Sequence, residues 1–348
     1  MILQNLRKVE SPQLLPPLIT FLLLSYNQEE FIEEAVNGAL LQSYSPLEII
    51  ISDDCSCDNT FSIIEKIVSH YVGPHTIIVN KNLTNLGIGA HLNKAMELSS
   101  GELIVAAAGD DISLPDRVDE VVNTWNTEGR PVCVIYSDVD QINKMGGYIA
   151  TNKSVEVPFI HPLLGATHPG IIGCTECWHR DLFNYFGPFM PGLVNEDNAL
   201  MFRAELIGKI LHVPRVLVKH RMHDFNTGSN NYKEDMDGRA WLSYIKNHFN
   251  RELLILQNAV CDLLILSNKN LEYDKSLIIE IKGKFLIEQI YYSSLLDLSN
   301  ASGFDKIKIA YKNFNIIGSR NKILFLKIIF PDFYRYLRMI YRDIFGRK

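Results

Sequence analysis

The sequence has no long hydrophobic run and little cysteine, and each absence removes a class of protein. A membrane-spanning helix needs about 20 consecutive apolar residues, and no segment of the 348 residues approaches this length. The N-terminal residues 1–17 mix charged with apolar side chains, unlike a signal peptide. Six cysteines are too few for a secreted disulfide scaffold of this size. We therefore expect a reduced, cytoplasmic protein.

Charge is also scarce, at 21% of the residues, and it is unevenly placed. The net charge is −6, but residues 304–348 alone carry +8, which leaves −14 on residues 1–303. An acidic body does not neutralise a phosphate backbone, so we expect no nucleic-acid partner. The hydrophobic content of 47% excludes disorder as the main state and allows one large core with an appendage.

Short apolar runs alternate with segments of helical period between residues 18 and 138, which is typical of βαβ units and a parallel sheet. The predicted strands are 18–24, 47–51, 76–79, 103–107 and 133–136. The predicted helices are about 31–40 with a capping box at Asn27 and Glu30, 59–71, 88–99, one from Ser113, and 196–207. From about Gly238 onward the pattern is helical throughout. The sequence therefore predicts the α/β class with a helical C-terminal region.

Polar residues follow four of these strands, at the edge where an open parallel sheet binds its ligands. They are residues 25–27, 52–54, 80–85 and 109–111. The first turn is Ser-Tyr-Asn, without the glycine-rich fingerprint of dinucleotide-binding proteins. Converging carboxylates repel each other unless a divalent cation or hydrogen-bond donors lie between them, so we expect a metal–nucleotide complex. The alternative is that each aspartate pair only caps a helix or closes a turn.

Three segments together resemble the nucleotide-sugar domain of family 2 glycosyltransferases, which have the GT-A fold. They are LITFLLLSYNQEEFIEEAVNGALLQSY, LEIIISDDCSCDNT and NLTNLGIGAHLNKAMELSSGELIVAAAGDDISLPDRVDEVV, and the resemblance covers about residues 17–225. It implies a Rossmann-like, mostly parallel sheet flanked by helices. The expected organisation is an N-terminal tail (1–16), a GT-A domain (17–235) and a helical C-terminal region (236–348).

The resemblance also implies a donor site. Asp54 would accept a hydrogen bond from the N3–H of uracil or thymine, for which a carboxylate is a suitable acceptor. Asp110 would face the ribose, and Asp111 would bind Mg²⁺ or Mn²⁺ on the diphosphate, where the metal acts as a Lewis acid. The motif here is Gly-Asp-Asp, whereas the family has Asp-x-Asp. The nucleotide-sugar-binding residues implied are Ser25, Asn27, Asp53, Asp54, Asn85, Asp110 and Arg221.

Two further elements complete the implied catalytic site. Asp197 would be the general base toward the acceptor hydroxyl, with Glu196 in support; the alternative is an acidic first turn favoured by the helix dipole. His223 would join Asp111 at the metal, and Arg221 would clamp a phosphate. His220 is the weaker histidine candidate.

The segment 165–180 lies where the family shapes its acceptor and sugar pocket. His168 and Glu176 would bind hydroxyl groups and Trp178 would stack on a sugar, although packing of Trp178 in the core is an equal alternative. Cys174 and Cys177 have the spacing of half a zinc site, but a second ligand pair is missing.

The C-terminal residues 331–345 place aromatic and aliphatic side chains on one helical face and arginines on the other. This pattern is typical of an interfacial helix, so residues 322–348 are expected at an anionic membrane surface on the inner face of the cell membrane. The alternatives are packing on the catalytic domain or on a second subunit, which would make a homo-oligomer.

The resemblance as a whole predicts a metal-dependent, inverting glycosyltransferase. It would move a sugar from a UDP or dTDP donor to a hydroxyl of a glycan or lipid-linked acceptor, in the synthesis of a surface polysaccharide such as O-antigen or capsule. One alternative is a sugar-phosphate nucleotidyltransferase, which would carry a basic, glycine-rich loop near residue 25 where this chain has SYNQEE. Another is a non-catalytic scaffold subunit of a membrane assembly.

Overall fold

The computed structural model describes residues 15–154, 172–223, 238–269 and 275–313, with Leu324 and Ile328. The expected N-terminal tail, His168 and the basic helix expected at 331–345 lie outside the described residues.

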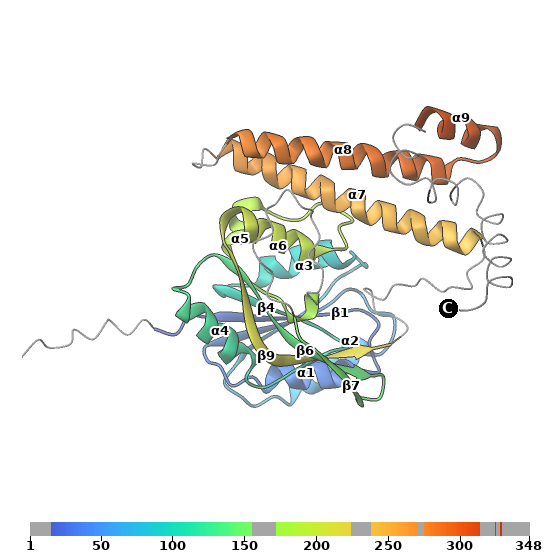
Figure 1. Ribbon diagram of the computed structural model, residues 1–348. Coiled ribbons are helices and arrows are strands. Elements are labelled where there is room, and N and C mark those ends of the chain that lie inside the picture. The colour runs from blue at the N-terminus through green and yellow to red at the C-terminus, as the bar shows by residue number, and fades with distance from the viewer. Residues whose placement is uncertain are drawn as a thin grey trace, which may run out of the picture.

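A nine-stranded sheet forms the centre of the molecule (Figure 1). Its strands are β1 (Ile19–Ser25), β2 (Leu47–Asp53), β3 (Thr76–Lys81), β4 (Leu103–Ala108), β5 (Ile112–Ser113), β6 (Cys133–Asn143), β7 (Tyr148–Asn152), β8 (Cys177–His179) and β9 (Lys209–Met222). The order is β3-β2-β1-β4-β8-β6-β9-β5, with β7 paired to β6. The first four strands are parallel, as predicted. The second half is mixed, because β8 is antiparallel to both β4 and β6 while β6 and β9 are parallel.

Helices cover both faces of the sheet (Figure 1). They are α1 (Ile32–Leu40), α2 (Thr60–Ser69), α3 (Ile88–Leu98), α4 (Arg117–Thr127), α5 (Asp181–Phe186), α6 (Glu196–Ile207), α7 (Gly238–Asn268), α8 (Lys275–Asn300) and α9 (Gly303–Asn313). Successive strand residues point to opposite faces, so Phe21 and Leu23 pack with α1, α2 and α4. Leu22 points the other way and packs with α3, α5 and α6. The near-continuous apolar strands follow from this double coverage.

The C-terminal helices continue from the α6 side of the sheet. α7 contacts α5 and α6 and packs along α8. The side chain of Ile255 on α7 is part of the same core as α3 and α6. Arg203 of α6 forms a buried ion pair with Asp262 of α7, at 2.9 Å between Nε and Oδ2. The division of domains at residue 235 stays a prediction, and α7 begins three residues after it.

One predicted helix cap and one predicted helix start are wrong. α1 begins at Ile32 and not at the predicted capping box, because Asn27 has a φ of 51° and its side chain binds a neighbouring loop. α4 begins at Arg117, because Ser113 belongs to β5 and pairs with Val218 of β9. In both places a tertiary contact competes successfully with a local capping signal. The helix predicted at 196–207 is confirmed as α6.

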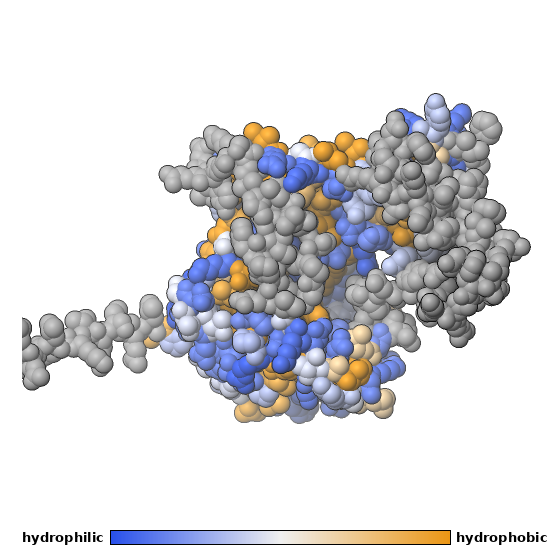
Figure 2. Space-filling model, viewed as in Figure 1, coloured by the Kyte–Doolittle hydropathy of each residue, from blue (hydrophilic) through white to orange (hydrophobic). Residues whose placement is uncertain are grey.

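α8 leaves part of its apolar surface uncovered. Four of its aliphatic side chains are at least half exposed: Ile279, Leu286, Ile287 and Ile290. Orange side chains lie along the upper edge of the molecule over this helix in Figure 2. Among the described residues, no helix is long and apolar enough to cross a bilayer.

Candidate active site

Three adjacent parallel strands end at one edge of the sheet and carry the first candidate residues. β1 ends at Ser25, opposite Asp53 at the end of β2. Gly109 follows β4, and its amide donates to the carbonyl of Leu24 on β1 at 2.9 Å. Ser25, Asp53 and the turn 109–111 therefore lie side by side.

The buried carboxylate of Asp53 is bound within its own turn. Its Oδ2 accepts the amide of Ser56 at 2.8 Å, and its Oδ1 accepts the hydroxyls of Ser56 and Ser25. Asn27 is exposed and joins the same turn, since its amide donates to Ser56 Oγ and its Oδ1 accepts the amide of Cys57. These contacts agree with the alternative that Asp53 closes a turn, because its carboxylate stabilises the loop after β2.

Asp54 is also buried, and it organises the next loop. Its Oδ1 accepts Nδ2 of Asn82 at 2.8 Å and the amide of Leu86 at 3.0 Å. Its Oδ2 accepts the amide of Gly87 at 2.9 Å. Asn85 supports the same turn, because its Oδ1 accepts the amide of Gly87, whose φ of 75° suits glycine. A carboxylate has about four acceptor positions, so one position remains on Oδ2.

The turn after β4 presents Asp110 and Asp111 to the end of β9. Asp110 Oδ2 lies 3.0 Å from Nε2 of His223, whose ring stacks on Phe31 at 4.9 Å between centroids. Burial and the charge of Asp111 raise the pKa of Asp110, although the hydrogen bond to His223 opposes the shift.

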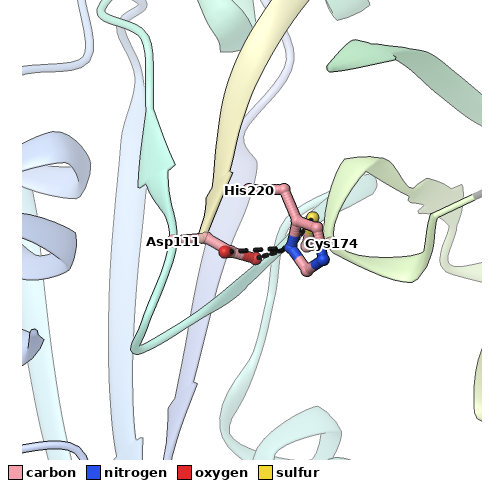
Figure 3. A group of neighbouring side chains, drawn as sticks. All are labelled: Asp111, Cys174 and His220. Carbon is pink, nitrogen blue, oxygen red and sulfur yellow. Dashed lines mark hydrogen bonds and ion pairs between the residues drawn. The ribbon is translucent and has the colours of Figure 1, made fainter. Parts of the chain in front are cut away.

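Asp111 faces His220 and Cys174, as Figure 3 shows. Its Oδ1 lies 3.1 Å from His220 Nδ1 and accepts the amide of Arg221 at 2.8 Å. Burial would lower the pKa of His220, but the hydrogen bond and charge of Asp111 outweigh it, and the pKa is raised. Burial and the nearby Asp111 raise the pKa of Cys174 well above its ordinary value. Cys174 is therefore a neutral thiol beside Asp111.

The donor atoms of Asp111, His220 and Cys174 lie within 4.8 Å of one another, close enough for one cation. The carboxylate oxygen and imidazole nitrogen fit Mn²⁺, and the oxygen alone fits Mg²⁺. The soft sulfur of Cys174 suits neither ion, because Mg²⁺ and Mn²⁺ prefer oxygen and nitrogen ligands. The residues that would hold the metal are therefore Asp111 and His220. His223, which the sequence suggested as the second ligand, binds Asp110 instead.

The guanidinium of Arg221 is buried and directed into the protein, so its position does not support a phosphate clamp. Its Nε donates to the carbonyl of Asp110 at 3.0 Å, and Nη1 donates to the carbonyl of Lys144 at 2.9 Å. Nη2 lies 3.1 Å from Glu34, and the group sits over the ring of Phe31. Arg221 thus fixes the 109–111 turn against β9.

Glu196 and Asp197 form the first turn of α6, where the helix dipole favours negative charge. Asp197 Oδ1 accepts the amide of Asn198 at 2.8 Å. Burial raises the pKa of Asp197, against the lowering effect of Asn198. Burial and the charge of Asp197 raise the pKa of Glu196 to about 8. A carboxylate with a raised pKa is a stronger base once ionised, which suits proton abstraction near neutral pH.

Glu176 adds a third carboxyl group to this pair. It is 1% exposed, and its Oε1 has no hydrogen-bond partner. Its backbone carbonyl accepts the amide of Ala106 on β4 at 3.1 Å. Burial, Asp197 and Glu196 raise the pKa of Glu176 well above its ordinary value. Glu176 thus places a carboxyl group with a raised pKa beside the candidate base.

A short 3₁₀ helix, Gly173–Thr175, joins the two groups of carboxylates. A Cβ at Gly173 would lie 3.3 Å from Oδ2 of Asp197, so the backbone passes directly against this carboxylate. The next residue, Cys174, lies at Asp111 and His220. The candidate base and the candidate metal ligands therefore flank one turn of chain.

Known proteins are similar to this chain in sequence and in fold. Residues 20–183 match the model of "Glycosyl transferase family 2". An uncharacterised glycosyltransferase of Rickettsia typhi is 26% identical over 306 residues, which cover 80% of this chain and 91% of that protein. Residues 20–183 are a glycosyl transferase family 2 domain. The protein is an enzyme that transfers a sugar.

A second relative and a solved structure are also similar to this chain. Chondroitin synthase of Pasteurella multocida is 26% identical over 235 residues, 67% of this chain and 22% of the synthase. The structure of Staphylococcus aureus TarS 1–349 in complex with UDP-GlcNAc has a TM-score of 0.55 at 17% identity, and the match covers 93% of this chain and 91% of that one. The GT-A fold and the C-terminal helices of the glycosyltransferase are thereby confirmed.

Trp178 does not line the site. It is 2% exposed on β8 and belongs to the core between the sheet, α5 and α6, with its ring near Phe183. The core alternative is therefore correct for this residue, because β8 lies between β4 and β6 and is covered on both faces. His168, the third pocket candidate, lies outside the described residues.

Sequence reasoning undervalued His220 and Asn82. The pattern at 219–223 offers two histidines, and only the pairing of β5 with β9 decides which one meets Asp111. Asn82 gave no signal beyond its place after a strand, yet it binds Asp54. The spacing of Cys174 and Cys177 indicates only half of a zinc site. In the structure Cys174 Sγ instead lies 3.8 Å from Nδ1 of His220, which is 46 residues away in the chain.

Proposed function

We propose that this glycosyltransferase is metal-dependent and inverting, and that it transfers a sugar from UDP or dTDP to a hydroxyl of a glycan or lipid-linked acceptor. The observation that carries the proposal is the shared turn at residues 173–174. Asp197 lies on one side of it, and Asp111 with His220 lies on the other. A sugar between them would have its diphosphate toward Asp111 and its anomeric carbon toward Asp197.

In this proposal Asp197 removes the proton of the acceptor hydroxyl as its oxygen attacks the anomeric carbon. Burial raises the pKa of Asp197, which keeps its basicity high. Asp111 and His220 would hold Mn²⁺ or Mg²⁺, which as a Lewis acid stabilises charge on the leaving diphosphate. Inversion follows from attack on the face opposite the leaving group in a single displacement.

The uracil or thymine base is assigned to the loop bound by Asp54. UDP-GlcNAc in the TarS structure, which has the same fold, is consistent with a UDP donor. A polysaccharide product is consistent with the chondroitin synthase relative. Assembly of a surface polysaccharide is the pathway we propose.

A thermal-shift screen of nucleotide sugars, with and without Mn²⁺, tests this function. A ligand that binds only the folded state raises the melting temperature. We expect UDP or dTDP sugars to do so in a Mn²⁺-dependent manner. If ADP, GDP and CMP sugars are the only ones that stabilise the protein, the proposed donor is wrong.

We also propose that residues 322–348 bind an anionic membrane surface on the cytoplasmic side. The proposal rests on the basic, amphipathic sequence. Liposome sedimentation of the full chain and of a chain ending at Gly303 tests it. Equal partition of both forms would exclude this contact. The same samples in light scattering would show whether the exposed face of α8 joins a second copy.

A further inference from the structure

A continuous chain of hydrogen bonds runs beneath the nucleotide edge and ends on Asp54. Asn82 Nδ2 donates to Asp54 Oδ1 at 2.8 Å. Asn80 Nδ2 donates to Asn82 Oδ1 at 3.1 Å and to Ser52 Oγ at 2.9 Å. Ser52 Oγ lies 2.7 Å from Nε2 of His91. The chain therefore links β2, β3 and α3 to one carboxylate.

The chain is buried and has a fixed direction. Ser52, Asn82 and His91 are 0%, 7% and 2% exposed, and Asn80 is half-buried. The side-chain amide of Asn80 donates to Ser52 Oγ and to Asn82 Oδ1. The oxygen of the Asn82 amide therefore faces Asn80, and its nitrogen faces Asp54. Breaking such a buried bond leaves a polar group unsatisfied, so each member holds the next in place.

The distribution of donors on Asp54 is asymmetric. Oδ1 receives two hydrogen bonds, from Asn82 and the amide of Leu86, whereas Oδ2 receives one, from the amide of Gly87. The rotation of the carboxylate is thereby fixed, and the open acceptor position belongs to Oδ2. A ligand group that completes the set must be a hydrogen-bond donor.

We propose that Asn82, held by Asn80, Ser52 and His91, is a positioning residue that sets Asp54 Oδ2 to accept the imide N3–H of a uracil-type base and so to reject cytosine. This inference rests on the proposed nucleotide-binding function. Uracil carries a hydrogen on N3, and cytosine has a lone pair there. A fixed acceptor would therefore repel cytosine, while a carboxylate free to rotate would discriminate less.

The test measures dissociation constants of UDP and CDP, each with Mn²⁺, by calorimetry on the full chain. We expect the parent to favour UDP. Asn82→Ala should weaken UDP binding roughly tenfold and leave CDP nearly unchanged, so that the preference collapses. Asn80→Ala, one step further from Asp54, should reduce the preference by about threefold.

Asn93→Ala is the matched control. Asn93 lies on α3 like His91, and it makes two side-chain hydrogen bonds to the backbone of Phe189, but it is not part of the chain. It should lower stability while keeping the UDP preference. Circular dichroism checks that each variant is folded.

The outcomes separate the inference from the function on which it rests. If the parent prefers UDP and the folded Asn82→Ala and Asn80→Ala variants keep the same preference, only the positioning role of Asn82 is wrong. A parent that binds neither nucleotide, or that binds UDP and CDP equally, overturns the nucleotide assignment together with it.

Discussion

The two groups of carboxylates in this glycosyltransferase differ in what surrounds them. Asp53 and Asp54 receive hydrogen bonds from amides, hydroxyls and an asparagine in the loops that follow β2 and β3. The group around Asp197 has little of this, since Glu176 Oε1 is without a partner and Asp197 is bound by its neighbour Asn198. Hydrogen-bond donors therefore stabilise the charge of Asp53 and Asp54. The carboxyl groups of Glu176, Glu196 and Asp197 have few donors, and their charges repel one another.

This difference separates geometry from reactivity. A carboxylate that accepts several hydrogen bonds has a fixed orientation and a stabilised charge, which suits recognition of a ligand. A carboxylate that is buried with few donors binds protons more strongly, which suits a base. Asp111 lies between these cases, with one amide and one histidine.

The largest effect is expected at Asp197. Asp197→Asn keeps the shape but cannot take the proton, so the rate of sugar transfer should fall by about 10²–10⁴-fold. Binding of UDP with Mn²⁺ should change less than about twofold, because the proposal assigns Asp197 to the acceptor hydroxyl and not to the nucleotide. Rates are measured with the donor found in the thermal-shift screen. A larger loss in Glu196→Gln than in Asp197→Asn would move the base to Glu196.

The next effect concerns a carboxylate that is fully paired. Asp262 binds Arg203 through both oxygens, at 2.9 and 3.0 Å, and both side chains are buried. Asp262→Ala leaves Arg203 buried and unpaired, so the free energy of unfolding should fall by about 3–5 kcal/mol. Asp181→Ala, at a half-exposed aspartate, is the control in the same urea titration and should change it by less than about 1 kcal/mol. Equal losses would contradict the role of this ion pair.

A smaller effect is expected at the metal. Asp111→Asn should remove most of the stabilisation that UDP with Mn²⁺ gives, about 2.7 kcal/mol at a ligand concentration 100-fold above Kd. Cys174→Ser should retain it, because sulfur is a poor ligand for Mn²⁺ beside a carboxylate oxygen and an imidazole nitrogen. Thermal melts with and without Mn²⁺ compare the three proteins. Loss in Cys174→Ser alone would make sulfur the ligand.

The smallest effect is a change in pH dependence. The pKa of Glu196 is raised to about 8 in the folded protein, above an unfolded value of about 4.3. The folded state therefore holds a proton that the unfolded state releases, and stability falls as the pH rises from about 5 through 8. Glu196→Gln should flatten this fall and be more stable than the parent at pH 8.5, by about 1 kcal/mol or more. Urea titrations at pH 5 and 8.5 measure the free energy of unfolding of both proteins. An equal fall for the parent and Glu196→Gln would contradict the prediction.

Local patterns were sufficient for the first half of the sheet but did not predict β5, β7, β8 and β9. Apolar runs and helical period located the first four strands and the helices between them, because burial on two faces leaves a direct trace in sequence. The signals that failed were those shared by several structures. Asn27 fits a helix cap and also a turn, and Trp178 fits a sugar platform and also a core.

The α/β class, the order of the motifs and the family resemblance can be recognised in the amino-acid sequence, since these depend on which residues follow which. Only the tertiary structure decided that His220 and not His223 meets Asp111, that Arg221 points inward, and that residues 173–174 lie between the two acidic groups. These facts depend on the pairing of β5 with β9 and the approach of the 173–175 turn to α6. Contacts between residues far apart in the chain set which donors each carboxylate receives, and the donors set what the carboxylate can do.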